Sequence, residues 1–179
     1  MKKIISIIFP TLLLIFISCI QISDTFHNCS SNDLKYKTTN ITLSNDLNSI
    51  PINLYHGKSD IEHKRGLMCV RDLKDINGML FSYKNEQSSA FWMYKTFIPI
   101  TIIFFDSNNL SVDLIEMKPC KRNLFQTIND YKLKCYEESK NYIPRTKYTN
   151  SIELIESFEK LEEIKTILED DKLKLMINN

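Results

Sequence analysis

Glycine, histidine and net charge are all scarce in this chain. It has three glycines, three histidines, and 23 basic against 22 acidic residues, a formal net charge of +1. A near-neutral chain lacks the basic face of nucleic-acid binders, so we expect no nucleic-acid partner. No segment resembles a phosphate-binding P-loop, a dinucleotide fingerprint, a nucleophile elbow or a zincin helix. These absences favour a protein that is not an enzyme and carries no cofactor.

Long hydrophobic runs are also missing, apart from one near the N-terminus. Two lysines precede an uncharged stretch of fourteen residues, Ile4 to Ile17. This stretch is shorter than the roughly 20 residues of a membrane-spanning helix. A basic start, a short apolar run and a small residue are typical of a secretory signal. We therefore predict export, with residues 1–18 as the signal peptide.

The residue after this leader is a cysteine, as in a bacterial lipobox. Cys19 would then become the first residue of the mature protein and carry a fatty acyl group such as palmitate. The prediction is a lipoprotein of the bacterial cell envelope, held to the membrane through its N-terminus on the periplasmic face or at the cell surface. An ordinary signal peptide cut elsewhere, or an uncleaved anchor, are the alternatives.

The remaining chain divides into a polar part and a folded part. Residues 19–46 are rich in Ser, Thr, Asn and Asp, which indicates a flexible tether. Residues 47–179 have the length and hydrophobic content of a single domain with its own core. We expect the ordered structure to begin near Ile50.

Four cysteines remain besides Cys19, and none is part of a CxxC pair. A structural zinc site or a thioredoxin-type motif is therefore not expected. In an export compartment cysteines can form disulfides, and four allow three pairings. We expect Cys120 to pair with Cys135, a loop of fifteen residues that a bridge stabilises by about 3 kcal/mol. The apolar neighbours of Cys69 indicate a buried, inert thiol.

Periodicity predicts a mainly β domain with a minor helical part. Two short helices are expected, one from Ser59 or Asp60 to about Leu67 and one from Ser157 to about Asp170. Residues 121–146 are expected to be a polar excursion. Short alternating or β-branched segments predict strands at 50–55, 78–83, 89–94, 98–105, 110–117, 148–155 and 173–177.

The central block resembles a known family in the order and spacing of several short motifs. They are Arg65-Gly66-Leu67-Met68, Arg71 and Leu73, Gly78-Met79-Leu80-Phe81, Phe91-Trp92-Met93, Thr96, Ile98-Pro99-Ile100, Phe105-Asp106, Met117 and Pro119-Cys120. The chain is similar, over roughly 48–178, to domain of unknown function family 192, also called uncharacterised protein family 0127. This resemblance implies a compact β-sandwich or jelly-roll-like domain and implies no established activity.

Four polar positions depart from the family pattern. The family motif is Trp-Met-Lys-Asn-Thr, and this chain has Tyr94 and Lys95 in place of its Lys-Asn. After Ile-Pro-Leu the family usually has Asp, where this chain has Thr101. Asp170 replaces the glycine of the closing Gly-Asp-Lys-Val turn. The apolar frame is kept, so these departures put any family activity in doubt for this chain.

The motif residues supply a candidate pocket, for which core packing is the competing interpretation. Its members are Arg65, Met68, Met79, Trp92, Met93, Thr96, Met117 and Cys120. The preferred function is non-catalytic binding of a small ligand, a peptide or an envelope protein.

Two further functions stay open. Soft sulfur ligands from Met68, Met79, Met93, Met117 and Cys120 would suit Cu(I), although no histidine or MxM spacing accompanies them. A hydrolase-like site would place His63 and Arg65 beside Asp106 or Asp113, without a recognised catalytic motif.

Overall fold

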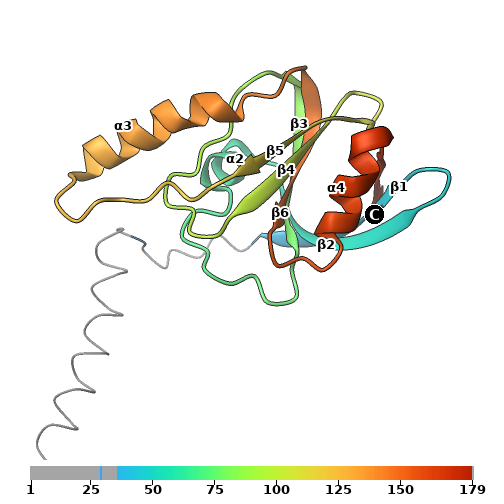
Figure 1. The fold of residues 1–179 in the computed structure, drawn as a ribbon, viewed down its shortest axis with the longest axis horizontal. Helices are drawn as coiled ribbons and strands as arrows, with labels where there is room; N and C mark the ends of the chain where they lie inside the picture. The colour runs from blue at the N-terminus through green and yellow to red at the C-terminus, as the bar shows by residue number, and fades with distance from the viewer. Residues whose placement is uncertain (1–28, 30–35, 179) are drawn as a thin grey trace, which may run out of the picture. The chain divides into compact units, whose positions relative to one another are not determined.

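Seven strands in one sheet and three α-helices make up the part of the chain that the structure describes (Figure 1). The structure, a computed structural model, describes Cys29 and residues 36–178, so the predicted signal peptide and Cys19 lie outside it. The elements are β1 Lys37–Ser44, β2 Ser49–Gly57, α2 Asp60–Arg65, β3 Gly78–Gln87, β4 Ile100–Phe105, β5 Ser111–Met117, α3 Ile128–Ser139, the 3₁₀ turn η1 Lys140–Tyr142, β6 Tyr148–Ile155, α4 Leu161–Asp170 and β7 Lys174–Asn178.

The strands form one continuous sheet in the order β5-β4-β6-β3-β2-β1-β7. Among the described strands, only β2 and β3 pair in parallel, because the connection through α2 carries the chain back to the same end of the sheet. The edge strands approach each other at one corner, where Leu110 bridges Lys174 and Ser111 N donates to Leu173 O at 2.9 Å. The prediction of a mainly β domain is confirmed. A sandwich would have two separate sheets, whereas here the strands belong to one bent sheet.

One face of the sheet packs against α4. Helix α4 contributes Leu161 and Ile164 at helical spacing, and Phe158 precedes it. Alternate residues of the strands, together with Leu173 just before β7, complete this first core: Ile41, Leu43, Ile50, Ile52, Leu54, Leu80, Ile103, Phe105, Ile152, Leu154, Leu173 and Leu175. Alternation along each strand leaves the other face for a second core.

The second core is covered by loops and by α3. Leu67 and Leu73 come from the segment after α2, Met93 and Tyr94 from the loop before β4, and Tyr131 from α3. Figure 1 shows α3 lying at one side of the sheet, away from α4. The described part of the chain contains no helix with the length and apolar character to cross a membrane.

Strand β1 corrects the predicted tether. Residues 37–44 lie between β2 and β7 in the sheet, with Asn40 opposite both Asn53 and Asn178. Their polar composition suggested a linker because only Ile41 and Leu43 are fully buried. The ordered domain therefore begins before the predicted residue 47.

Two other segments differ from their predictions. Residues 89–94 are a loop and not a strand, and a turn from Thr96 N to Met93 O follows directly. Within the expected polar excursion lies α3, which buries only Tyr131, Cys135 and Ser139 at a spacing of four. So narrow a stripe leaves the sequence polar overall and hides its helical period.

Helix α4 starts four residues after the predicted cap. Its N-cap is Lys160, without a side-chain hydrogen bond, and Ser157 does not cap it. A turn from Phe158 N to Ile155 O comes first. By contrast, Ser59 caps α2 as predicted, in a capping box with Glu62.

Candidate functional site

The predicted pocket residues meet, but as packed core. Met79, Met93, Met117, Thr96 and Cys120 are buried, and none of them lines a cavity described below. The two half-buried members, Met68 and Trp92, pack against the same core, and Arg65 ends α2. The core interpretation of this set therefore fits the geometry better than the pocket interpretation.

The soft-metal interpretation loses its only thiolate. Cys120 is joined to Cys135 by a disulfide, with their Cα atoms 5.7 Å apart. Cys69 is disulfide-bonded as well, so the prediction of a free thiol there is wrong. Among the residues described by the structure, no three His, Cys, Asp or Glu side chains are grouped to hold a metal ion.

Two departures from the family pattern have structural roles. Tyr94 lies between Trp92 and Tyr131, with ring centroids 5.2 and 5.1 Å away. Lys95 has a positive φ of 57°, accepts from Cys69 N at 2.7 Å through its carbonyl, and donates its N–H to the Tyr131 hydroxyl at 3.1 Å. Burial, with the nearby Arg122 and Arg65, lowers the pKa of the Lys95 ammonium. These residues hold together the loops over the second core.

The proposed enzyme residues do not form a catalytic group. His63 lies against Tyr83, with ring centroids 4.4 Å apart and the rings tilted by 42°, and its Nε2 lies 3.0 Å from Gly57 O. Asp106 accepts from Asn108 N and Leu110 N in the β4–β5 turn. Each side chain therefore serves its own local structure.

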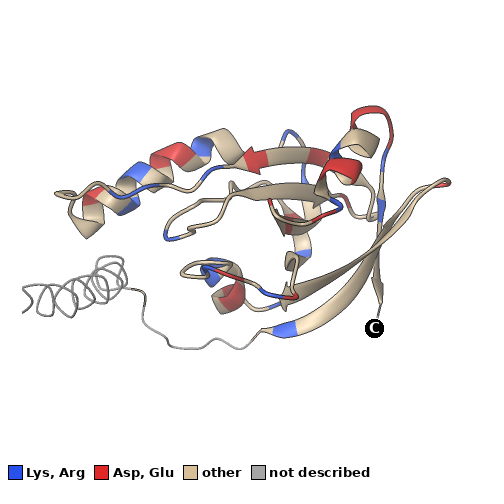
Figure 2. Ribbon diagram, turned by 60° about the horizontal axis from the view of Figure 1, so that its bottom comes forward, with Lys and Arg blue, Asp and Glu red and all other residues tan. Residues whose placement is uncertain are grey.

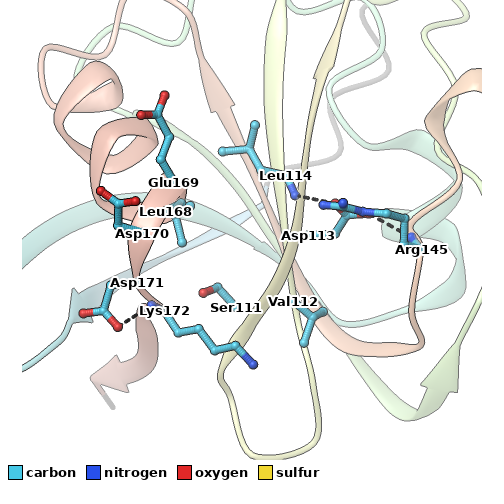
Figure 3. A pocket seen from close by; sticks show the side chains of 10 residues that line it. All are labelled: Ser111, Val112, Asp113, Leu114, Arg145, Leu168, Glu169, Asp170, Asp171 and Lys172. Carbon is cyan, nitrogen blue, oxygen red and sulfur yellow. Dashed lines mark hydrogen bonds and ion pairs between the residues drawn. The ribbon is translucent and has the colours of Figure 1, made fainter.

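A cleft of about 400 Å³ lies where β5 meets the end of α4. We call it the β5–α4 cleft (Figure 3). Its size falls in the range of small-molecule sites. It is lined by Ser111, Val112, Asp113, Leu114, Arg145, Leu168, Glu169, Asp170, Asp171 and Lys172.

The pair Asp113 and Arg145 forms one wall of this cleft. The guanidinium Nη2 and Nε donate to Asp113 Oδ1 at 2.6 and 3.0 Å, and Arg145 N donates to Oδ2 at 2.8 Å. Burial alone would raise the pKa of Asp113, but these bonds from Arg145 outweigh it and hold the pKa below its ordinary value. Asp113 is therefore a fixed carboxylate and not a proton donor.

The opposite wall is acidic. Glu169, Asp170 and Asp171 follow one another at the end of α4 and are exposed (Figures 2 and 3). Hydrogen bonds from Lys172 N and from the Asn45 side chain lower the pKa of Asp171. The cleft thus carries four carboxylates against the two cations Arg145 and Lys172.

The cleft has no nucleophile with a base beside it. Its only hydroxyl, Ser111 Oγ, accepts from Leu173 N at 2.9 Å, and no histidine is among its lining residues. Val112, Leu114 and Leu168 supply apolar surface, and Figure 3 shows Leu114 pointing toward α4. The arrangement suits binding by charge and shape more than chemistry.

Sequence reasoning missed this cleft, except for two weak signals. Asp113 is one of the two carboxylates of the predicted hydrolase-like site, and Asp170 is the departure at the family's closing turn. The structure places both in the same cleft. The replacement of glycine by Asp170 therefore adds a carboxylate to the cleft.

Two buried titratable groups lie elsewhere in the sheet. Glu153 in β6 is buried, its Oε2 has no hydrogen-bond partner, and burial raises its pKa to about 8. His56 Nε2 lies 3.0 Å from Ser82 Oγ, and burial together with Lys58 lowers its pKa to about 4. At neutral pH both groups are therefore uncharged in the folded protein.

Comparison with known proteins gives a family and a fold. The family described as "Uncharacterized ACR", DUF192, matches residues 42–139. Curated proteins yield no match.

Two solved structures resemble the chain. One is "a putative transcription regulator" from Sinorhizobium meliloti 1021, with a TM-score of 0.58 and 15% identity, covering 82% of this chain and 98% of that one. The other, a protein of unknown function from Novosphingobium aromaticivorans DSM 12444, has a TM-score of 0.56 and 16% identity over 82% of this chain and 90% of that one. At such identities the likeness supports the fold alone.

Proposed function

Because the chain belongs to the DUF192 family, whose description names no activity, we propose a function from its own geometry. The protein is an exported, membrane-anchored domain that binds a positively charged small ligand or peptide segment without transforming it. The observation that carries the proposal is the β5–α4 cleft, which combines carboxylates and apolar side chains but lacks a nucleophile–base pair.

The charges of the cleft select the ligand. Asp113 is neutralised by Arg145, so the carboxylates at 169–171 are the acceptors that remain for an incoming cation. They are exposed, and each ion pair with a ligand is therefore worth at most about 1 kcal/mol. The apolar surface of Leu114 and Leu168 adds affinity for a methylene chain, as in a lysine side chain.

The state of the cysteines supports the exported location. Cys29, Cys69, Cys120 and Cys135 are all disulfide-bonded. Disulfides persist mainly in oxidising compartments, so this pattern agrees with the signal-like N-terminus. Anchoring through an acylated Cys19 completes the proposal.

Calorimetric titration with a short lysine peptide tests the ligand. We expect Gly-Lys-Gly to bind the native chain and Gly-Glu-Gly not to bind. The double variant Glu169→Gln, Asp170→Asn should bind the lysine peptide about tenfold more weakly. Asp75→Asn, which changes an exposed carboxylate elsewhere, is the matched control. Equal binding by native chain and double variant would remove the cleft as the site.

The location has a separate test. Intact mass spectrometry of the native protein should find residues 1–18 removed and an acyl group on the new N-terminal cysteine. A chain that retains Met1 and fractionates with cytosolic proteins contradicts the exported, anchored location and leaves the ligand proposal standing.

A further inference from the structure

Two large apolar side chains are exposed to solvent in the loop before α3. Leu124 and Phe125 are the central residues of a turn closed by Gln126 N, which donates to Asn123 O at 3.1 Å. Their exposed fractions are 75% and 96%. We call residues 123–126 the apolar tip.

Side-chain hydrogen bonds fix the apolar tip. Arg122 Nε and Nη2 donate to Gln126 O at 3.0 and 2.8 Å, and Gln126 Oε1 accepts from Asn123 N at 3.2 Å. Thr127 caps α3 directly afterwards, through Asp130 N. These hydrogen bonds fix the conformation of the loop, so the entropy cost of ordering it on binding is small.

The surroundings of the apolar tip are basic. Residues 118–136 contain a single acidic side chain, Asp130, while Glu137 and Glu138 lie at the far end of α3, where Glu138 pairs with Lys134 at 3.6 Å. Figure 2 shows both blue and red segments along α3. The basic residues of the stretch 118–136 are Lys118, Lys121, Arg122, Lys132 and Lys134. In a chain of net charge +1, this is a local excess of positive charge beside exposed apolar groups.

We propose that the apolar tip inserts into the headgroup region of an anionic phospholipid bilayer, with the flanking lysines facing lipid phosphates. Apolar side chains surrounded by cations are the pattern of interfacial membrane contacts. Two apolar residues make a small centre for a protein interface, which usually buries about 800 Å² on each side. This second contact goes beyond the proposed function, since it needs neither the β5–α4 cleft nor the acyl group.

Such a contact would act together with the anchor. One membrane signal alone gives weak, reversible attachment, whereas an acyl chain and a basic patch together give stable attachment. The acyl group keeps the domain at the surface, and the apolar tip then selects anionic lipid and orients the domain.

Fluorescence can locate the contact on the full chain. Phe125→Trp is mixed with vesicles of phosphatidylcholine and phosphatidylglycerol at 7:3, with bromine on the acyl chains. We expect the new tryptophan to be quenched and blue-shifted beyond the signal of Trp92, which the native chain supplies alone. Ile61→Trp is the matched control, because Ile61 is also exposed, at 68%, but lies between Asp60 and Glu62. Equal quenching at positions 61 and 125 would overturn the proposal.

Binding measurements separate the apolar tip from the anchor. In the chain from residue 19 onward with Cys19→Ser, which carries neither the apolar leader nor an acyl group, Leu124→Ser with Phe125→Ser should weaken binding to the same vesicles by about tenfold or more. Lys121→Gln should weaken it by about fivefold, and pure phosphatidylcholine vesicles should bind poorly. If the serine pair changes nothing, the proposal fails even where acylation of Cys19 is found.

Self-association is the competing occupant of this surface. Sedimentation of the native chain without lipid should show one species that the serine pair does not alter. An oligomer that dissociates in that variant would assign the apolar tip to a second copy of the chain and overturn the lipid proposal.

Discussion

Asp113 and Arg145 form an ion pair in which one partner is buried and the other is in solvent. Their Oδ1 and Nη2 atoms are 2.6 Å apart, while the side chains are 3% and 81% exposed. The arginine backbone N–H also donates to Asp113, so the pair ties the loop before β6 to edge strand β5. This wall of the β5–α4 cleft therefore depends on one carboxylate.

Asp113→Asn should destabilise the protein. The change keeps the shape but removes the charge that accepts three hydrogen bonds from Arg145, a loss on the order of 1–2 kcal/mol in unfolding free energy at pH 7. Because the folded pKa of Asp113 is lowered, this contribution is lost as the pH falls through that pKa. Urea denaturation at pH 7 and pH 3 should show the difference shrinking in acid. Asp75→Asn is the control, and an equal loss there would contradict the assignment.

The double change Cys120→Ser, Cys135→Ser should loosen α3. The disulfide closes a loop of separation 15, for which its removal costs about 3 kcal/mol. Tyr131 Oη still donates to Cys120 O at 2.9 Å, so we expect a weakened helix and not an unfolded domain. Urea denaturation and helical circular dichroism measure the two effects. An unchanged denaturation midpoint would show that the helix is held by other contacts.

Local signals explain which elements could be predicted from the sequence. The strands predicted at 98–105 and 110–117 form the β4–β5 hairpin, whose turn is local because Asp106 Oδ1 accepts from the N–H groups of Asn108 and Leu110. Strand β6 has its predicted bounds, 148–155. The capping box of α2 lies within four consecutive residues. In the hairpin turn and the capping box the stabilising partner is close in sequence, whereas β6 is predicted from its own residues although it pairs with the distant strands β3 and β4.

The missed elements depend on distant partners. Strand β1 pairs over its whole length with the next strand, β2, and also with β7, more than 130 residues later in the chain, through pairs such as Leu43 with Leu175. Helix α3 is joined to Cys120 through Cys135, and its Tyr131 packs in the second core. The β5–α4 cleft joins residues 111–114, 145 and 168–172, whose meeting follows from the sheet order. The periodicity of a single segment therefore cannot predict that these three segments lie together.

His56→Gln should remove part of the acid sensitivity of the fold. Burial and the Lys58 charge lower the folded pKa of His56 from 6.5 to about 4. The unfolded chain binds the proton first, so the native protein loses stability as the pH falls from about 6.5 to about 4. Unfolding free energies across this window should slope less in the variant. Ser82→Ala removes the hydrogen bond to His56 and leaves its burial, so it should keep the native slope.

Gly78→Ala should be far more costly than Gly57→Ala. A Cβ at Gly78 would lie 1.7 Å from the Glu153 carbonyl oxygen, where β3 pairs with β6 and the backbone has no room to move. At Gly57 it would lie 2.7 Å from Met79 Cε, the flexible end of a side chain. We expect Gly78→Ala to lower the unfolding free energy by about 3 kcal/mol or more, and Gly57→Ala to lower it by about 1 kcal/mol. Thermal unfolding of both variants checks this, and similar losses would contradict the close approach of β3 and β6.

Glu153→Gln should stabilise the protein increasingly as the pH rises. Burial raises the folded pKa of Glu153 from 4.5 to about 8, so the native state keeps a proton that the unfolded chain releases. Stability present below about pH 4.5 is therefore lost as the pH rises to about 8. Glutamine has nearly the same shape and does not titrate, so the variant lacks this loss, and its advantage above pH 8 should reach a few kcal/mol. Glu159→Gln, an exposed change of the same kind, controls for net charge. Parallel stability profiles of native chain and Glu153→Gln between pH 5 and 9 would show that the carboxyl is ionised in the fold and that its Oε2 has a partner.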